Sequence, residues 1–169
     1  MNLERLLNRL FKYDLSAALA CILLPFVLWI GDGPRSSISD YAYGDISFIY
    51  VFLLTVAATL ITTIGVRKDQ TFTWILGLNL MLIPLTPHLT YPTLHTITSV
   101  IFFGGMSYHI IRYSDEFKSF RWFLVGAMVL GFVLHYLINI ISLFAAESIA
   151  MVIFGVNFLV DLIENKNEL

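Results

Sequence analysis

The sequence predicts an all-α fold, a polytopic membrane protein formed by a bundle of six transmembrane helices. Three observations predict it. First, 58% of the residues are apolar and the mean hydropathy is +0.81, which exceeds what a soluble domain normally carries. Second, the apolar residues form six segments bounded by charged residues, Pro or Gly. Third, every Lys and Arg except Arg35 falls on one side of these segments.

The six apolar segments have lengths that match membrane crossings. They cover residues 15–30, 46–66, 72–85, 94–111, 122–144 and 148–162. A hydrocarbon core of about 30 Å asks for about 17 to 25 helical residues, so several segments are at the short limit. We therefore predict six crossings. A chain of 169 residues has room for these helices and short connections, and we expect one transmembrane domain over residues 1–169.

Trp and Pro residues support the first three segments. Trp29 suits the outer headgroup level at the end of the first segment, and Trp74 suits the cytoplasmic level at the start of the third. Pro25 and Pro84 should bend the first and third helices near their outer halves. The second segment, 46–66, ends at a pair of basic residues.

Small residues characterise the later segments and predict where helices approach closely. They are Gly77 in the third segment, Gly104 and Gly105 in the fourth, Ala127 and Gly131 in the fifth, and Gly155 in the sixth. Trp122 marks the cytoplasmic end of the fifth segment.

The N-terminus has an amphipathic pattern. Apolar residues recur at helical spacing at Leu3, Leu6, Leu7, Leu10 and Phe11, with polar and basic residues on the other face. This pattern predicts a short amphipathic helix lying on the cytoplasmic leaflet. A simple extension of the first crossing fits equally well. The apolar run continues past Cys21 without a small-residue cleavage site, so we expect an uncleaved first helix.

The distribution of basic residues predicts the orientation. Apart from Arg35 they are Arg5, Arg9, Lys12, Arg67, Lys68, Arg112, Lys118, Arg121 and Lys166. Short loops rich in Lys and Arg stay in the cytoplasm. We therefore expect both termini inside and the loops around Arg35, His88 and Ala145 outside. The small loops and absence of tails favour a bacterial inner membrane.

The charge favours some classes of binding partner over others, and the cysteine content bears on disulfide bonds. The net charge of −2 gives no reason to expect nucleic acid. The basic residues are better suited to anionic lipid headgroups, so membrane lipids are the expected partners. A homo-oligomer or a membrane partner protein is also compatible with the small-residue faces. Cys21 is the single cysteine, which excludes an intramolecular disulfide.

Polar residues in the outer half of the bundle form the candidate site. They are Ser39, Asp40, His95, His135, Asn139 and Glu147. His135, Asn139 and Ser142 are spaced i, i+4 and i+7, which places them on one face if the fifth helix is continuous. The long outer loop, 31–45, lies above them. Ionisable residues within membrane segments are costly and usually face the bundle interior, so a site is the default hypothesis.

Each of these residues also has a purely structural interpretation. Glu147 suits a helix N-terminus, and His95 suits the membrane interface. His135 and Asn139 suit hydrogen bonds between helices, as do Asn79 and Asn157. His88, between Pro87 and Pro92, and His109, near the cytoplasmic rim, are expected to lie outside the site.

The function favoured by these residues is non-enzymatic binding of a lipid headgroup or small amphipathic ligand in an outer pocket. One alternative is a membrane-embedded, metal-dependent hydrolase, with zinc held by His95, His135 and a carboxylate from Glu147 or Asp40. The sequence has no HExxH pattern, and no cofactor is expected. Catalysis by Ser39 or Ser99 with a His is a further possibility. The other alternative is an accessory subunit of a membrane complex.

Short motifs resemble the damage-regulated autophagy modulator family and its uncharacterised bacterial six-helix relatives. They are Ser37-Ile38-Ser39-Asp40, Phe102-Phe103-Gly104-Gly105 after His95, and Glu147-Ser148-Ile149-Ala150 leading to Phe154-Gly155. The Pro-Glu pair that often follows the serine motif in the autophagy branch is missing. The resemblance implies a six-helix bundle without established catalytic activity, and it draws attention to Ser39, Asp40, His95 and Glu147.

Overall fold

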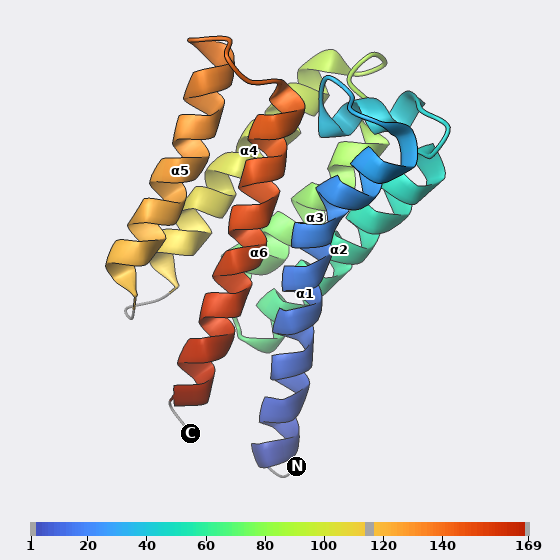
Figure 1. Ribbon diagram of the computed structural model, residues 1–169. Helices are drawn as coiled ribbons and strands as arrows, with labels where there is room; N and C mark the ends of the chain where they lie inside the picture. Colours follow the sequence, from blue (N-terminus) through green and yellow to red (C-terminus); the bar gives the residue numbers. More distant parts are fainter. Residues whose placement is uncertain (1–2, 114–116, 168–169) are drawn as a thin grey trace.

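The computed structural model describes residues 3–113 and 117–167, all helical apart from the connections (Figure 1). The α-helices are α1 (Leu3–Asp32), α2 (Ser47–Arg67), α3 (Thr71–Leu85), α4 (Pro92–Arg112), α5 (Lys118–Tyr136) and α6 (Leu143–Asn167). A short 3₁₀ helix, η1 (Ile38–Tyr43), lies between α1 and α2. The described residues contain no strand, which confirms the all-α class.

The helices form a closed ring. Each helix packs against the next one along the chain, and α6 packs against α1 to complete the circle. The helix η1 contacts α1, α2, α3 and α6 at one end of this bundle, and both termini lie at the opposite end (Figure 1). We call these the η1 end and the terminal end.

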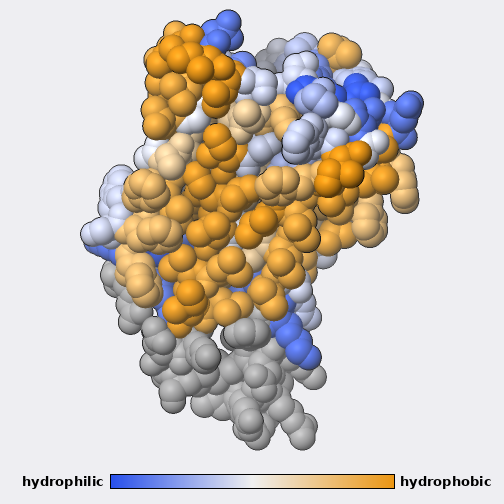
Figure 2. Space-filling view, in the orientation of Figure 1, coloured by the Kyte–Doolittle hydropathy of each residue, from blue (hydrophilic) through white to orange (hydrophobic). Residues whose placement is uncertain are grey.

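Five helices are long and apolar enough to cross a membrane. Their candidate spans are Lys12–Asp32, Ser47–Arg67, Pro92–Arg112, Lys118–Tyr136 and Leu143–Glu164. The helix α3 is apolar but has 15 residues, a length of about 22 Å. Large apolar side chains such as Phe48 and Phe123 are exposed, and Figure 2 shows an apolar surface over the middle of the visible face with hydrophilic residues gathered near the η1 end. This is the surface expected of a membrane protein.

Glycines allow close packing at two of the predicted positions. A Cβ atom on Gly155 would lie 2.8 Å from the Ala18 carbonyl oxygen, so α6 approaches the backbone of α1 directly. A Cβ on Gly77 would lie 2.6 Å from the backbone nitrogen of Thr62 in α2. Gly104 behaves differently, because its Cβ would meet nothing within 4 Å. Gly104 therefore makes no close helix contact within the chain, and a role for it toward a partner stays a prediction.

The backbone decides between the two predictions made for the N-terminal residues. A single helix runs from Leu3 to Asp32, so the chain continues from its start into the first candidate span without a break. This is the extension considered as the alternative to a separate interfacial helix. The side chains of residues 1–11 lie outside the described ones, and the predicted amphipathic face stays a prediction.

The predicted fifth segment, 122–144, is too long. Helix α5 ends at Tyr136, and α6 begins at Leu143. Asn139 has a φ of 56°, and its N–H donates to the His135 carbonyl at 3.2 Å. This left-handed residue closes the helix, a conformation that Asn tolerates better than most residues. The apolar residues on both sides of Asn139, which are Leu137, Ile138, Ile140 and Ile141, concealed this turn, because hydropathy alone does not distinguish a helix from an apolar loop.

Candidate functional site

The loop before α2 is a compact structure built on η1. The backbone N–H of Ser37 donates to Asp40 Oδ2 at 3.0 Å. At the edge of the loop, Arg35 pairs with Asp32 at 2.6 Å. The buried Tyr41 hydroxyl donates to the Gly33 carbonyl at 2.5 Å, and burial raises the pKa of Tyr41, which keeps the phenol protonated as a donor.

Helix α6 holds this loop through Glu147. The Glu147 Oε2 atom accepts the backbone N–H of Ile38 at 2.6 Å, a contact between residues 109 positions apart. The Phe144 N–H donates to the Ser36 carbonyl at 2.8 Å beside it. Glu147 is buried and is the fifth residue of α6. The structural interpretation that places Glu147 at the helix N-terminus is therefore wrong, and its hydrogen-bond partner belongs to another element.

His88 belongs to the site, although the sequence analysis left it outside. Its Nε2 lies 3.2 Å from Asp40 Oδ1, and its Nδ1 lies 3.4 Å from Ser39 Oγ. The Ser39 hydroxyl is also 2.9 Å from the Ser37 hydroxyl. The Tyr43 ring stands edge-on to His88 with ring centroids 5.3 Å apart. The imidazole is therefore fixed between two residues that are adjacent in the sequence.

His95 and His135 each bind a backbone carbonyl through Nδ1. His95 reaches the Thr86 carbonyl at 2.8 Å, and His135 reaches the Ile141 carbonyl at 2.9 Å. A carbonyl oxygen can only accept, so Nδ1 donates in both rings, and in the neutral ring Nε2 is left as an acceptor. The centroids of His88 and His95 are 5.8 Å apart.

All six predicted site residues line one pocket of about 960 Å³ at the η1 end. Its other polar lining residues are Ser36, Ser37, His88, Thr96, Ser99 and Ser142. Asn139 and Ser142 reach it from the loop after α5, so the predicted shared helix face with His135 is wrong even though the three side chains meet. No Lys or Arg is among the described residues that line the pocket.

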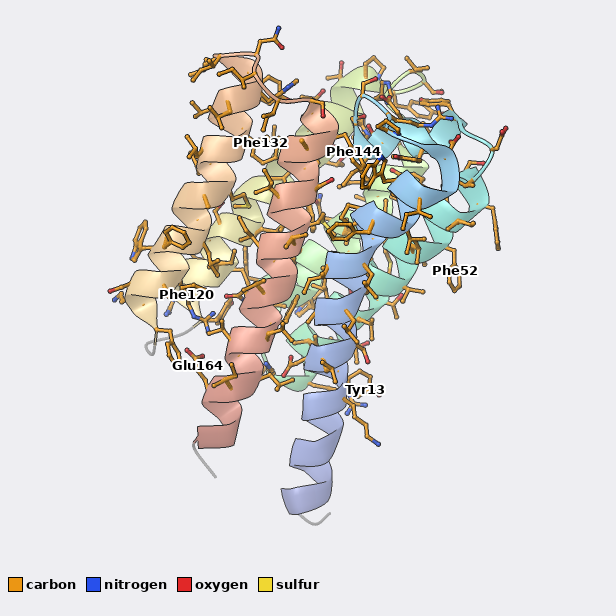
Figure 3. The ribbon with its side chains drawn as sticks, in the orientation of Figure 1. Tyr13, Phe52, Phe120, Phe132, Phe144 and Glu164 are labelled. Atoms are coloured by element: carbon orange, nitrogen blue, oxygen red, sulfur yellow. The ribbon has the colours of Figure 1, made fainter. Side chains whose placement is uncertain are left out.

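An apolar groove between α4 and α5 borders the pocket. The groove has a volume of about 330 Å³ and includes Ser107, Met128, Val129, Val133 and Leu137. Four residues line both hollows, namely Phe103, Gly104, Phe132 and Tyr136. Figure 3 labels Phe132 on α5, in the half of that helix nearer the η1 end. A pocket that contains polar groups and an apolar groove thus lie next to each other along one side of the bundle.

A second polar cluster lies at the terminal end. We call the side chains of Asp14, Lys68, Arg121, Asn157, Asp161 and Glu164 the buried charge network. Arg121 donates to Asn157 Oδ1 at 2.5 Å, to Asp161 Oδ1 at 2.7 Å and to Glu164 Oε2 at 2.7 Å. Lys68 Nζ lies 3.0 Å from Asp14 Oδ2 and 3.8 Å from Asp161 Oδ2. Figure 3 shows Glu164 at this end of α6.

This network was not predicted from the sequence. Arg121 was expected in a cytoplasmic loop, whereas its side chain is 1% exposed and lies within α5. The expected interhelical role of Asn157 is confirmed by its bond to Arg121. One available signal was the i, i+4, i+7 spacing of Asn157, Asp161 and Glu164, which places three acceptors on one helix face.

The described residues do not bring metal-ligating side chains together in one place. Across residues 3–113 and 117–167, no group of three His, Cys, Asp or Glu side chains could hold a metal ion. His95, His135 and Glu147 line the same pocket without forming the zinc site considered from the sequence.

Comparisons with known proteins place the chain in a family. Neither the curated proteins nor the solved structures contain a match to it. Nothing in the comparisons links it to the damage-regulated autophagy modulator family, so that resemblance stays a prediction. A family model matches residues 23–162, a region that includes every candidate site residue. The chain belongs to this family, described as a family of unknown function (DUF7103).

Proposed function

We propose that the protein binds an amphipathic lipid at the η1 end, with the polar headgroup in the pocket and an acyl chain in the groove between α4 and α5. The observation that carries this proposal is that the two hollows are neighbours and share four lining residues, Phe103, Gly104, Phe132 and Tyr136. Ligand sites are typically apolar clefts with a few placed polar groups. An amphipathic molecule matches both parts at once.

The polar part favours a headgroup that donates hydrogen bonds. Its lining contains the carboxylates of Asp40 and Glu147 and the acceptor nitrogen of His95. No cation lines the described part of the pocket, so a multiply charged anionic headgroup would lack compensation. A headgroup carrying hydroxyl or amine groups fits this lining.

The apolar part decides how the ligand enters rather than how tightly it binds. An acyl chain that leaves the bilayer for the groove exchanges one apolar environment for another, so the hydrophobic effect contributes little. Selectivity therefore depends on the headgroup contacts. Gly104 keeps the groove open, since a Cβ there meets no atom within 4 Å.

The proposal includes six crossings with both termini in the cytoplasm. An even number of crossings is supported by the two termini lying at the same end of the bundle (Figure 1), because five crossings would separate them. Helix α3 would supply the sixth crossing at its short length, which a locally thinned bilayer accommodates at modest cost. The basic residues of the terminal end support a cytoplasmic position for it. A bacterial inner membrane stays a prediction.

Filling the groove tests the lipid proposal. Gly104→Leu would place a side chain in the groove, whereas Gly126→Leu is the matched control, since Gly126 is also an open, exposed helical glycine and lines neither hollow. Both variants and the parent would be purified in mild detergent, and retained lipid would be quantified by native mass spectrometry. We expect Gly104→Leu alone to lose the retained lipid. Equal retention in all three proteins would reject the proposal.

A further inference from the structure

Ser39, His88 and Asp40 form a connected chain of hydrogen-bonding groups inside the pocket. Ser39 Oγ lies 3.4 Å from His88 Nδ1, and His88 Nε2 lies 3.2 Å from Asp40 Oδ1. All three side chains line the proposed lipid pocket. They come from η1 and from the loop between α3 and α4, so the arrangement is made only in the folded chain.

The direction of each bond follows from the carboxylate. An ionised Asp40 can only accept, so His88 Nε2 donates to it and the Nδ1 lone pair faces Ser39. The Ser39 hydroxyl then donates to His88 Nδ1 and accepts from Ser37, whose hydroxyl is 2.9 Å away. Asp40 is itself held by the Ser37 backbone N–H at 3.0 Å. This order, in which a fixed carboxylate orients an imidazole toward a hydroxyl, is that of a serine nucleophile and its base.

We propose that Ser39 is a nucleophile activated by His88, with Asp40 as a positioning residue, and that the protein cleaves a carboxylic ester of an amphipathic lipid. The inference rests on the proposed lipid site and adds chemistry to it. It replaces the non-enzymatic function favoured by the sequence. In the usual serine triad the Nε2 atom of the histidine faces the serine, whereas here the Nδ1 atom of His88 does. Either nitrogen carries a lone pair in the appropriate tautomer, so the base chemistry is unchanged.

Two further contacts hold His88 in place. The Tyr43 ring packs edge-on against the imidazole at 5.3 Å between centroids, and the Tyr43 hydroxyl accepts the N–H of Leu89 at 2.8 Å. Tyr43 therefore holds both the imidazole and the backbone of the residue that follows it. The 3.4 Å separation of Ser39 and His88 is longer than a strong hydrogen bond, and such bonds tighten when substrate is bound.

The reaction balances without any further cofactor. The Ser39 Oγ attacks the ester carbonyl carbon while His88 Nδ1 takes the hydroxyl proton. The bond between the carbonyl carbon and the leaving alkoxide then breaks, and that oxygen receives the proton from His88. Water attacks the resulting acyl-Ser39 ester with His88 again as base. A carboxylic acid leaves, and the Ser39 hydroxyl is restored.

A fluorophosphonate probe with an alkyl chain tests the nucleophile in the full-length protein in detergent. We expect a covalent adduct that peptide mapping assigns to Ser39 and that Ser39→Ala abolishes. Ser47→Ala is the control, since Ser47 lies at the same end of the bundle outside the pocket lining. We expect His88→Ala to slow labelling by about 10²- to 10⁴-fold, the usual contribution of a general base.

The test of Asp40 as a positioning residue uses a kinetic parameter that a purely structural role would not change. We expect Asp40→Asn to lower the maximal labelling rate at saturating probe while the probe concentration for half-maximal rate stays unchanged. Lipid retention of each variant serves as the check on folding. Absence of an adduct on Ser39 in protein that retains lipid would overturn the nucleophile and leave the binding proposal standing. An adduct that forms at the parental rate in His88→Ala would equally overturn it. If Gly104→Leu retains as much lipid as the parent, the lipid site alone is rejected.

Discussion

Replacing Arg121 by Met should destabilise the protein more than any other removal of a single basic residue from α5. Arg121 is 1% exposed and donates to Asn157, Asp161 and Glu164 at 2.5 to 2.7 Å. Breaking a buried ion pair from one side costs about 3–5 kcal/mol, because the remaining charge stays desolvated. Met has a similar shape and fills the space, so the loss arises from charge and hydrogen bonding rather than from a cavity.

The assay is thermal unfolding in detergent followed by tryptophan fluorescence. A loss of about 3–5 kcal/mol corresponds to a fall in Tm of about 6 to 20 °C for a chain of this size. Lys118→Met is the control, since Lys118 is the first residue of the same helix and is exposed, and it should change stability by about 0.5 kcal/mol or less.

The double variant Arg121→Met with Asp161→Asn tests the cause of the loss. Without Arg121 the Asp161 carboxylate keeps, among the described residues, only Lys68, at 3.8 Å. Removing that carboxylate should therefore recover part of the stability. If Arg121→Met unfolds at the same temperature as Lys118→Met, the buried charge network does not stabilise the fold and the reasoning is refuted. If the double variant shows no recovery, the loss does not come from the stranded charge.

Two further predictions concern the loop and the orientation. Glu147→Ala leaves the Ile38 N–H without its acceptor, so we expect the stability to fall by about 1–3 kcal/mol and proteolysis within residues 33–46 to become faster. Glu147→Gln keeps an acceptor and should retain most of the stability and of the protease resistance. Equal digestion of the two variants would contradict this. In a Cys21→Ser background, we expect Asp45→Cys to react with an impermeant thiol reagent on intact cells and Lys12→Cys to react only after lysis, and the reverse pattern would invert the topology.

The candidate site shows which inferences were available from the sequence. Glu147 and His95 were selected because ionisable groups inside apolar segments need polar surroundings. His88 was left out, because a histidine between two prolines in a loop looks like a solvated residue. Its partner Asp40 is 48 positions away, and nothing in the local pattern relates the two. The pairing depends on how η1 packs against the ring of helices.

Some helix boundaries could likewise be predicted from the sequence, and others could not. Helix α2 begins and ends within one residue of the predicted segment 46–66, because a basic pair ends its apolar run. Helix α5 ends at Tyr136, eight residues before the predicted 144. There the apolar sequence continues through the turn, and the left-handed backbone of Asn139 decides the end of the helix.

The sequence by itself determined the helical class, the apolar character of the helices and the collection of acids, histidines and serines from which the pocket is made. Hydropathy and basic flanks are local properties, and they can be read along one segment at a time. Only the tertiary structure decided that Glu147 holds Ile38, that His88 lies between Ser39 and Asp40, and that Arg121 is buried among acceptors. These contacts join residues from separate elements, and a buried polar group takes whichever partner the packing of the whole bundle brings within reach.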